Sequence, residues 1–95
     1  PIVPMENVET AYYLRLQVMD KPGVLADITR ILADSDISIS AMVQKEHAEE
    51  EDKVNIIMLT HTTIEKNINR AIDKIEKLPA MAGKVVRIRL EELRK

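Results

Sequence analysis

The spacing of apolar residues switches along the chain between every second residue and every third or fourth, and these switches divide the sequence into elements. Alternation at period two is typical of a strand with one buried face, whereas steps of three and four are typical of an amphipathic helix. The expected order is a strand, a helix, two strands, a helix and a strand, over residues 12–18, 23–35, 37–45, 54–61, 62–78 and 84–90. Because each βα unit requires a right-handed crossover, this βαββαβ order predicts a ferredoxin-like α+β sandwich. In that fold two helices cover one face of a four-stranded antiparallel sheet.

The length of 95 residues is that of one domain. We expect residues 11–95 to form it and residues 1–10, which contain Pro1 and Pro4, to form a linker or an extended arm. The chain begins with Pro1 rather than Met, as an excised piece of a longer protein would. We expect a cytoplasmic location, because the sequence has neither a visible signal peptide nor an apolar run approaching the ~20 residues that span a bilayer.

The distribution of apolar residues over the two faces of each strand predicts whether the sheet needs a partner. The first strand is expected to bury Tyr12, Leu14, Leu16 and Val18, and the last to turn Val86, Ile88 and Leu90 inward and Arg87 and Arg89 outward. The third strand is apolar on both faces, since Ile56 and Met58 alternate with Ile57 and Leu59. Such a strand is covered on two sides. Two helices cover only one, so we expect a second copy of the chain to cover the other face or extend the sheet.

The ends of the helices and the second strand also have local signals. The first helix is expected to end at Asp34-Ser35-Asp36, because Asp tolerates the left-handed conformation better than most residues. Thr62 and Glu65 have the spacing of a capping box for the second helix. The second strand is expected to alternate, with one face formed by Ile37, Ile39, Ala41 and Val43 and the other by Ser38, Ser40, Met42 and Gln44.

The acidic run HAEEEDK, residues 47–53, separates the second and third strands. It is expected to be a solvated hairpin loop. A calcium site is the alternative, but the carboxylates are consecutive and lack the alternating spacing and the glycine of an EF-hand loop.

Composition argues against nucleic-acid binding and against catalysis by this chain alone. The net charge of −2 and the absence of a basic stripe do not suit a nucleic acid. The RNA-recognition motif has the same element order, but it needs aromatic side chains on its central strands, and VNIIMLTH has none. There is no cysteine, the two histidines are His47 and His61, and two glycines cannot build a phosphate-binding loop. His61 is expected to pack or cap the next helix, with ligand contact as the alternative.

The stretch VMDKPGVLA, residues 18–26, places an open turn between the first strand and the first helix. The N–H groups of Gly23, Val24 and Leu25 open a helix, where unpaired amides and a partial positive charge suit a carboxylate. Asp20 could accept an ammonium group, so the corner has the chemistry to hold a free amino acid. Alternatively, Asp20 is only the N-cap of the helix, which stabilises it by about 1 kcal/mol, and Pro22-Gly23 is only a turn.

DKPGVLADITRIL followed by DISI, on a βαββαβ frame, resembles the ACT domain, a regulatory module that binds amino acids. The resemblance covers residues 11–90. It implies a homodimer of side-by-side domains with the ligand between the first strand–helix turn of one subunit and the second strand of its neighbour. Carried over by position, the ligand-binding residues would be Asp20, Pro22, Gly23, Val24, Leu25, Ser38 and Gln44, with Ser38 and Val18 departing from the residue types of some members.

ETAYYLRLQV, SISAMVQKE, IIMLTH and VRIRLEEL are similar to the C-terminal ACT domain of bacterial homoserine dehydrogenases. These enzymes reduce aspartate semialdehyde with NAD(P)H and are commonly inhibited by threonine, so the resemblance implies a feedback sensor with threonine as the favoured ligand. The catalytic part would precede Pro1, and the chain has no G-x-G-x-x-G motif. We therefore expect no catalytic residue, metal or cofactor in this chain, and NAD(P) only in that missing part. The alternative is an assembly module without a functional ligand pocket.

Overall fold

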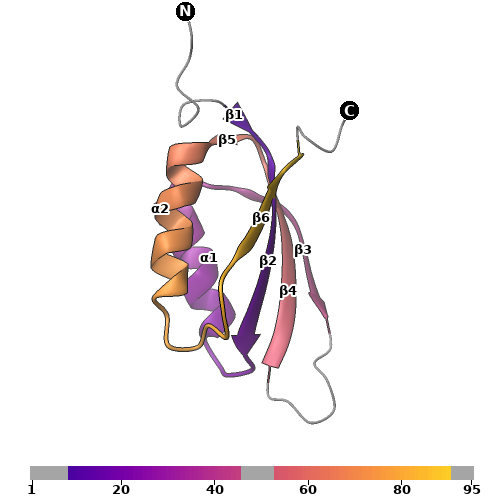
Figure 1. Ribbon diagram of the computed structural model, residues 1–95, viewed down its shortest axis with the longest axis vertical. Coiled ribbons are helices and arrows are strands. Elements are labelled where there is room, and N and C mark those ends of the chain that lie inside the picture. The colour runs from indigo at the N-terminus through magenta and orange to yellow at the C-terminus, as the bar shows by residue number, and fades with distance from the viewer. Residues whose placement is uncertain (1–8, 46–52, 91–95) are drawn as a thin grey trace, which may run out of the picture.

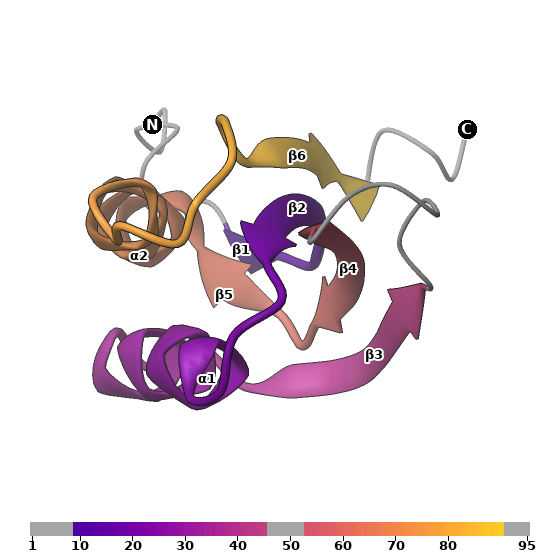
Figure 2. The same ribbon diagram turned by 90° about the horizontal axis from the view of Figure 1, so that it is seen from below.

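The computed structural model describes residues 9–45 and 53–90. Its elements are β1 (Glu9–Thr10), β2 (Tyr12–Met19), α1 (Val24–Asp34), β3 (Ile39–Lys45), β4 (Lys53–Thr60), β5 (Thr63–Ile64), α2 (Glu65–Glu76) and β6 (Val86–Arg89). The larger sheet has the strand order β3-β4-β2-β6, and every pair in it is antiparallel. Both helices lie on one face of this sheet (Figures 1 and 2). The expected α+β sandwich is confirmed.

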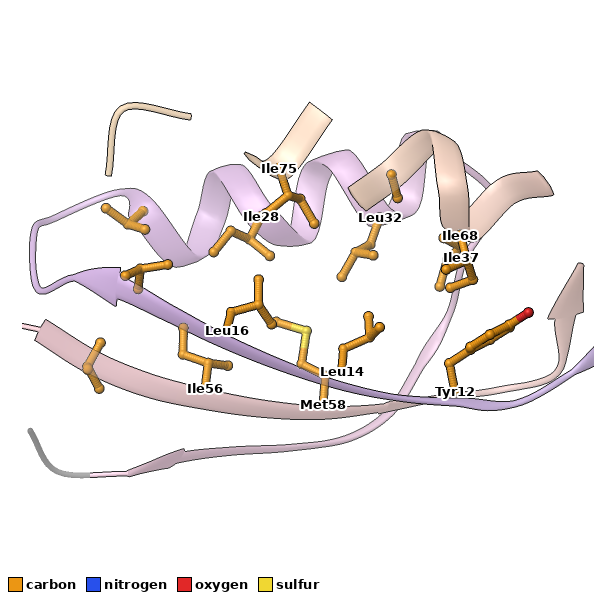
Figure 3. Packing of buried hydrophobic residues seen from close by; sticks show 14 residues of the cluster. Tyr12, Leu14, Leu16, Ile28, Leu32, Ile37, Ile56, Met58, Ile68 and Ile75 are labelled. Carbon is orange, nitrogen blue, oxygen red and sulfur yellow. The ribbon is translucent and has the colours of Figure 1, made fainter. Parts of the chain in front are cut away.

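The core lies between the helices and the larger sheet. Alternate residues of β2 point into it, as expected, and all four are at most 1% exposed: Tyr12, Leu14, Leu16 and Val18. Figure 3 shows Tyr12, Leu14 and Leu16 facing the apolar stripes of both helices, which contribute Ile28, Leu32, Ile68 and Ile75. Burying one such aliphatic side chain stabilises the fold by roughly 1.5–3 kcal/mol. The apolar residues whose spacing predicted the fold therefore also form the core that stabilises it.

The second helix begins later than the capping box predicts. Thr63 and Ile64 are extended and pair antiparallel with Thr10 and Glu9 as a separate two-stranded sheet. Ile64 is consequently the N-cap of α2, and no side chain of residues 9–45 or 53–90 caps this helix. The capping box of Thr62 and Glu65 is therefore wrong, because strand pairing holds its middle residues out of the helical conformation. The expected arm contributes β1, and residues 1–8 lie outside the described residues.

The two faces of β6 are the reverse of the expectation. Arg89 lies opposite Tyr12, and Arg87 lies opposite Leu14, so both arginines are on the helix side of the sheet. Val86 and Ile88 point to the other side, where they are 40% and 36% exposed. The cause is the register with β2, because opposite residues of paired strands share a face.

The side chains of β3, the strand expected over residues 37–45, do not alternate regularly between the two faces of the sheet. A bulge between Ile39 and Ala41 inserts a residue, so Ile39 lies opposite Thr60, whereas Met42 lies opposite Met58. Thr60 and Met58 both face the helices, so the bulge moves Met42 and Gln44 to the helix side. Ala41 and Val43 turn to the other face, and the prediction that they share a face with Ile39 is wrong.

The hairpin between β3 and β4 is present, with Lys45 opposite Asn55. Most of the acidic run, residues 47–52 including His47, lies outside the described part of the chain, whereas Lys53, which was expected in the loop, begins β4. None of the helices within residues 9–45 and 53–90 is long and apolar enough to cross a membrane.

The first helix ends where the sequence predicts, with Asp36 in the left-handed conformation at φ 62°. The Ile37 N–H donates to the Leu32 carbonyl at 2.9 Å and the Asp36 N–H to the Ala33 carbonyl at 3.0 Å. These two bonds form a Schellman motif. We expect Asp36→Val to lower the free energy of unfolding by about 1–2 kcal/mol, because a β-branched residue resists positive φ. Asp36→Gly should stay within about 0.5 kcal/mol of the parent. Urea unfolding measures the stability of both variants. An equal loss of stability in the two would contradict the assignment of Asp36 as the left-handed residue that ends α1.

Candidate functional site

The turn between β2 and α1 occupies residues 20–23 at one end of the sandwich (Figure 1). Gly23 has φ 85° and is the N-cap of α1. A side chain with Cβ would be strained at this φ, which explains why glycine suits the position. Because the N-cap is Gly23 and no described side chain caps the helix, the interpretation of Asp20 as its N-cap is wrong. Asp20 is exposed at the mouth of the turn.

The first turn of α1 presents backbone amides, as every helix N-terminus does. The Val24 N–H donates to the Lys21 carbonyl at 3.4 Å, a long hydrogen bond and hence a weak one. The Asp27 N–H donates to the Gly23 carbonyl at 3.0 Å and closes the first helical turn. The Leu25 N–H is among the groups that helix geometry leaves without an intrahelical acceptor. The positive end of the helix dipole and these amides favour an anion at this corner.

A small hollow of about 50 Å³ lies beside this turn. It is lined by Val18, Met19, Asp20, Lys21, Val24, Leu25, Gln44, Val54 and Ile56. Four of the residues proposed from the sequence therefore meet there: Asp20, Val24, Leu25 and Gln44. Gln44 reaches it because the bulge in β3 puts that residue opposite Ile56, on the helix side of the sheet. Within one chain, the β2–α1 turn and β3 thus border the same hollow.

The remaining proposed residues lie elsewhere. Pro22 and Gly23 are exposed in the turn but do not line the hollow. Ser38 precedes β3, and its carbonyl accepts the His61 N–H at 2.8 Å. Gln44 is six residues further along, so at roughly 3.3 Å per residue about 20 Å separates the two. Within one chain, Ser38 and the turn do not form a common site.

Sequence reasoning missed Met19, Lys21, Val54 and Ile56 as neighbours of the turn. The β2–β4 register places Val18 opposite Val54 and Leu16 opposite Ile56, which puts apolar side chains at the base of the hollow. The sequence predicted that β4 is apolar on both faces, but only the strand pairing shows which of its residues lie beside the turn. The base of the hollow is therefore apolar, and its mouth carries Asp20 and Gln44.

The hollow is too small for a whole amino acid. Its volume of about 50 Å³ compares with the roughly 10–15 Å³ that a cavity needs to hold one water molecule, so it has room for a few waters. A ligand could place one end here and would need further contacts from outside this chain.

The side of the larger sheet away from the helices is the open face. Its exposed apolar residues include Val43, Val86 and Ile88. Ile57 and Leu59 of β4 are half-buried on the same face. The apolar character of both faces of β4 is thus confirmed, and in the described residues of one chain no second layer covers the open face (Figure 2).

The described residues contain no group of three or more His, Cys, Asp or Glu placed to hold a metal ion. His61 is exposed at the end of β4.

Comparisons with known proteins agree with this geometry. The sequence pattern described as "ACT domain" matches residues 12–80. Homoserine dehydrogenase of Methylobacillus glycogenes is 61% identical over 93 residues, which are 98% of this chain and 23% of that protein. A crystal structure of a homoserine dehydrogenase from Thiobacillus denitrificans superposes with a TM-score of 0.84 at 67% identity and covers 94% of this chain and 19% of that one.

The ACT domain of GTP pyrophosphokinase from Chlorobium tepidum superposes with a TM-score of 0.67 at 18% identity, over 85% of this chain and 100% of that one, and shares the fold alone. The chain spans about a fifth of the length of the homoserine dehydrogenases that it matches.

Proposed function

This chain belongs to the ACT domain family and is similar to the C-terminal region of bacterial homoserine dehydrogenases, and from that premise we propose that it binds a free amino acid as a regulatory domain. The observation that carries the proposal is the convergence of Asp20, the start of α1 and Gln44 on one small hollow. The ligand carboxylate would accept hydrogen bonds from the amides of Gly23, Val24 and Leu25, and its ammonium group would donate to Asp20.

Three features of the corner support this assignment of roles. Asp20 does not cap the helix, so its carboxylate is not required for that structural task. Gly23 presents no side chain, and a Cβ added there would meet nothing within 4 Å, so the backbone is open to a ligand. Pro22 has no N–H and fixes its own φ, which stiffens the turn before a ligand arrives.

A second copy of the chain would complete the site. The hollow holds only a fraction of an amino acid, so the proposal requires contacts from outside the chain. We propose a side-by-side homodimer in which β3 of the partner and the Ser38 that precedes it close over the turn. Ser38 is exposed just before β3, an edge strand of the larger sheet, so a neighbour can reach it.

Threonine is the ligand that we favour, on the resemblance to homoserine dehydrogenases. The small apolar base of the hollow, formed by Val18, Val54 and Ile56, suits a short side chain better than a long one. The parent protein would be a cytoplasmic NAD(P)-dependent homoserine dehydrogenase whose catalytic part lies outside this chain. Ligand binding at a subunit contact would then shift that part by a coupling of roughly 1–3 kcal/mol, the usual allosteric range.

Isothermal titration calorimetry of the 95-residue chain tests the proposal. We expect saturable heat with threonine, and weaker or no heat with isoleucine, methionine, serine and lysine. Light scattering on the same samples should give the mass of a dimer. Saturable heat with another amino acid but not with threonine would support amino-acid binding and reject threonine as the ligand. The absence of heat with all five amino acids at millimolar concentration would reject the proposed binding.

An assembly module without a ligand is the second candidate. The uncovered apolar residues of the open face favour a role in subunit contact whether or not a ligand binds. A dimer by light scattering together with no heat in the titration would support this candidate.

A further inference from the structure

The reversed faces of β6 create a second polar hollow, at the end of the molecule opposite the β2–α1 turn. Its lining residues are Tyr12, Glu65, Arg87, Ile88 and Arg89, and its volume is about 240 Å³. Tyr12 begins β2, and the turn follows the last residue of that strand. Figure 1 shows the start of α2, where Glu65 lies, at the end of the sandwich away from this turn. We call this space the arginine hollow.

Side chains of α2 hold both arginines in position. Arg89 Nη1 lies 3.4 Å from Glu65 Oε1, and both side chains are mostly buried, at 26% and 22% exposed. Arg87 Nη1 donates to Asn69 Oδ1. The two arginines are two residues apart on one face of a strand, so their Cα atoms are roughly 6.6–6.8 Å apart. Both guanidinium groups therefore border one space in a fixed arrangement.

The hydroxyl group of Tyr12 is the unusual feature of the arginine hollow. The residue is 1% exposed, and its hydroxyl oxygen is buried with no hydrogen-bond partner within 3.5 Å among the described residues. An unsatisfied buried polar group costs about 1–3 kcal/mol, so such groups are rare in folded proteins. Figure 3 shows the hydroxyl at the end of the core, directed away from Leu14.

The same hydroxyl remains protonated and able to donate. Burial, followed by the negative charge of Glu65, raises the pKa of Tyr12, although Arg89 and Arg87 oppose the shift. The Tyr12 backbone N–H is already used, because it donates to Thr60 Oγ1 at 3.0 Å. The hydroxyl is thus a neutral O–H donor that lies beside Glu65 and two guanidinium groups.

We propose that the arginine hollow binds a small oxyanion, either a carboxylate or a phosphate group. The lining contains two guanidinium groups and one carboxylate. Guanidinium groups bind carboxylate and phosphate oxygens in a bidentate manner, and the Tyr12 hydroxyl would donate a further hydrogen bond. The uncapped N-terminus of α2 begins at Glu65 and adds a partial positive charge. This site is separate from the amino-acid site at the turn and does not depend on it.

An NMR titration of the ¹⁵N-labelled chain tests the proposal, with inorganic phosphate and succinate as probes at constant ionic strength. We expect saturable shifts of the amides of Tyr12, Glu65 and Arg87–Arg89, and little change at Gly23 or Val24. The preferred probe distinguishes a phosphate site from a carboxylate site. Shifts that stay linear to tens of millimolar with both probes would overturn the proposal.

Two variants separate a binding site from a structural network. Arg87→Gln should weaken binding about tenfold or more, because it removes a charged donor. The matched control is Arg70→Gln, which removes an exposed arginine of α2 outside the hollow and should leave the affinity unchanged. An equal loss in the two variants would indicate only general charge attraction and would overturn the proposal.

Tyr12→Phe removes the hydroxyl and keeps the buried ring. We expect a several-fold loss of anion affinity without a fall in thermal stability, since an unsatisfied hydroxyl is removed. Lower stability with unchanged affinity would show that the hydroxyl serves Glu65 instead, which would remove Tyr12 from the site.

Discussion

Asp20→Ala is expected to weaken threonine binding about 10- to 150-fold while leaving the thermal unfolding midpoint nearly unchanged. The range corresponds to the ~1.5–3 kcal/mol of a hydrogen bond to a charged group. Stability should change little, because Asp20 is exposed and does not cap α1. Calorimetric titration and thermal unfolding of the same preparation measure the two effects.

Asp34→Ala is the matched control for this variant. Asp34 is an exposed aspartate at the other end of the same helix. Removing its carboxylate should leave ligand affinity intact and raise stability slightly, because a negative charge at a helix C-terminus is unfavourable. If Asp20→Ala lowers stability and leaves binding unchanged, the carboxylate has a structural role and the proposed ammonium contact is wrong.

Ile56→Ala is expected to lower the free energy of unfolding by about 2–5 kcal/mol, a large part of the 5–15 kcal/mol typical of a domain. Ile56 is 1% exposed in the core between the helices and the sheet (Figure 3). Truncation there leaves a cavity that the packed surroundings cannot fill. Urea unfolding at several protein concentrations measures the loss.

The neighbouring residue provides the control and tests the open face. Ile57 is the same residue type on the opposite side of β4, where it is half-buried in one chain. Ile57→Ala should cost less than about 1.5 kcal/mol in dilute protein, because less apolar area is involved. If a second copy covers the open face, the cost should grow with protein concentration. A concentration-independent cost would argue that partners pair elsewhere.

Local periodicity predicted the elements that local contacts stabilise. The alternation of β2 and the apolar stripe of α1 predicted which of their residues are buried, and Asp36 marked the end of the helix. The end of the helix depends on a local interaction, the Ile37 N–H bonded to the Leu32 carbonyl, and the buried faces follow from the spacing of apolar residues within each element. The spacing of apolar residues and the residue at a helix end can both be read from one sequence.

Expectations failed where distant segments pair. The capping box failed because Thr63 and Ile64 pair with β1, which is more than 50 residues away along the chain. The faces of β6 were reversed because Arg87 and Val86 follow the register of β2 rather than their own hydrophobicity. An edge strand tolerates arginines on the helix side because α2 offers Asn69 and Glu65 as partners there.

The candidate site divides in the same way. Asp20, Val24 and Leu25 belong to one strand–turn–helix connection, so their proximity follows from neighbouring residues in the sequence. Gln44 joins them only through the β3–β4 pairing and its bulge, and Ser38 is left at the far end of β3. The role of each residue in ligand binding stays a prediction, for the titrations above to test.

By itself, the sequence determined the order of elements, the buried stripes and the open turn at Gly23, because these depend on spacing and on backbone preferences of single residues. Only the tertiary structure decided strand register, and register assigns each side chain to a face of the sheet. It therefore placed Gln44 beside the turn and both arginines beside the buried Tyr12 hydroxyl, since a shift of one residue would have turned them to the other side.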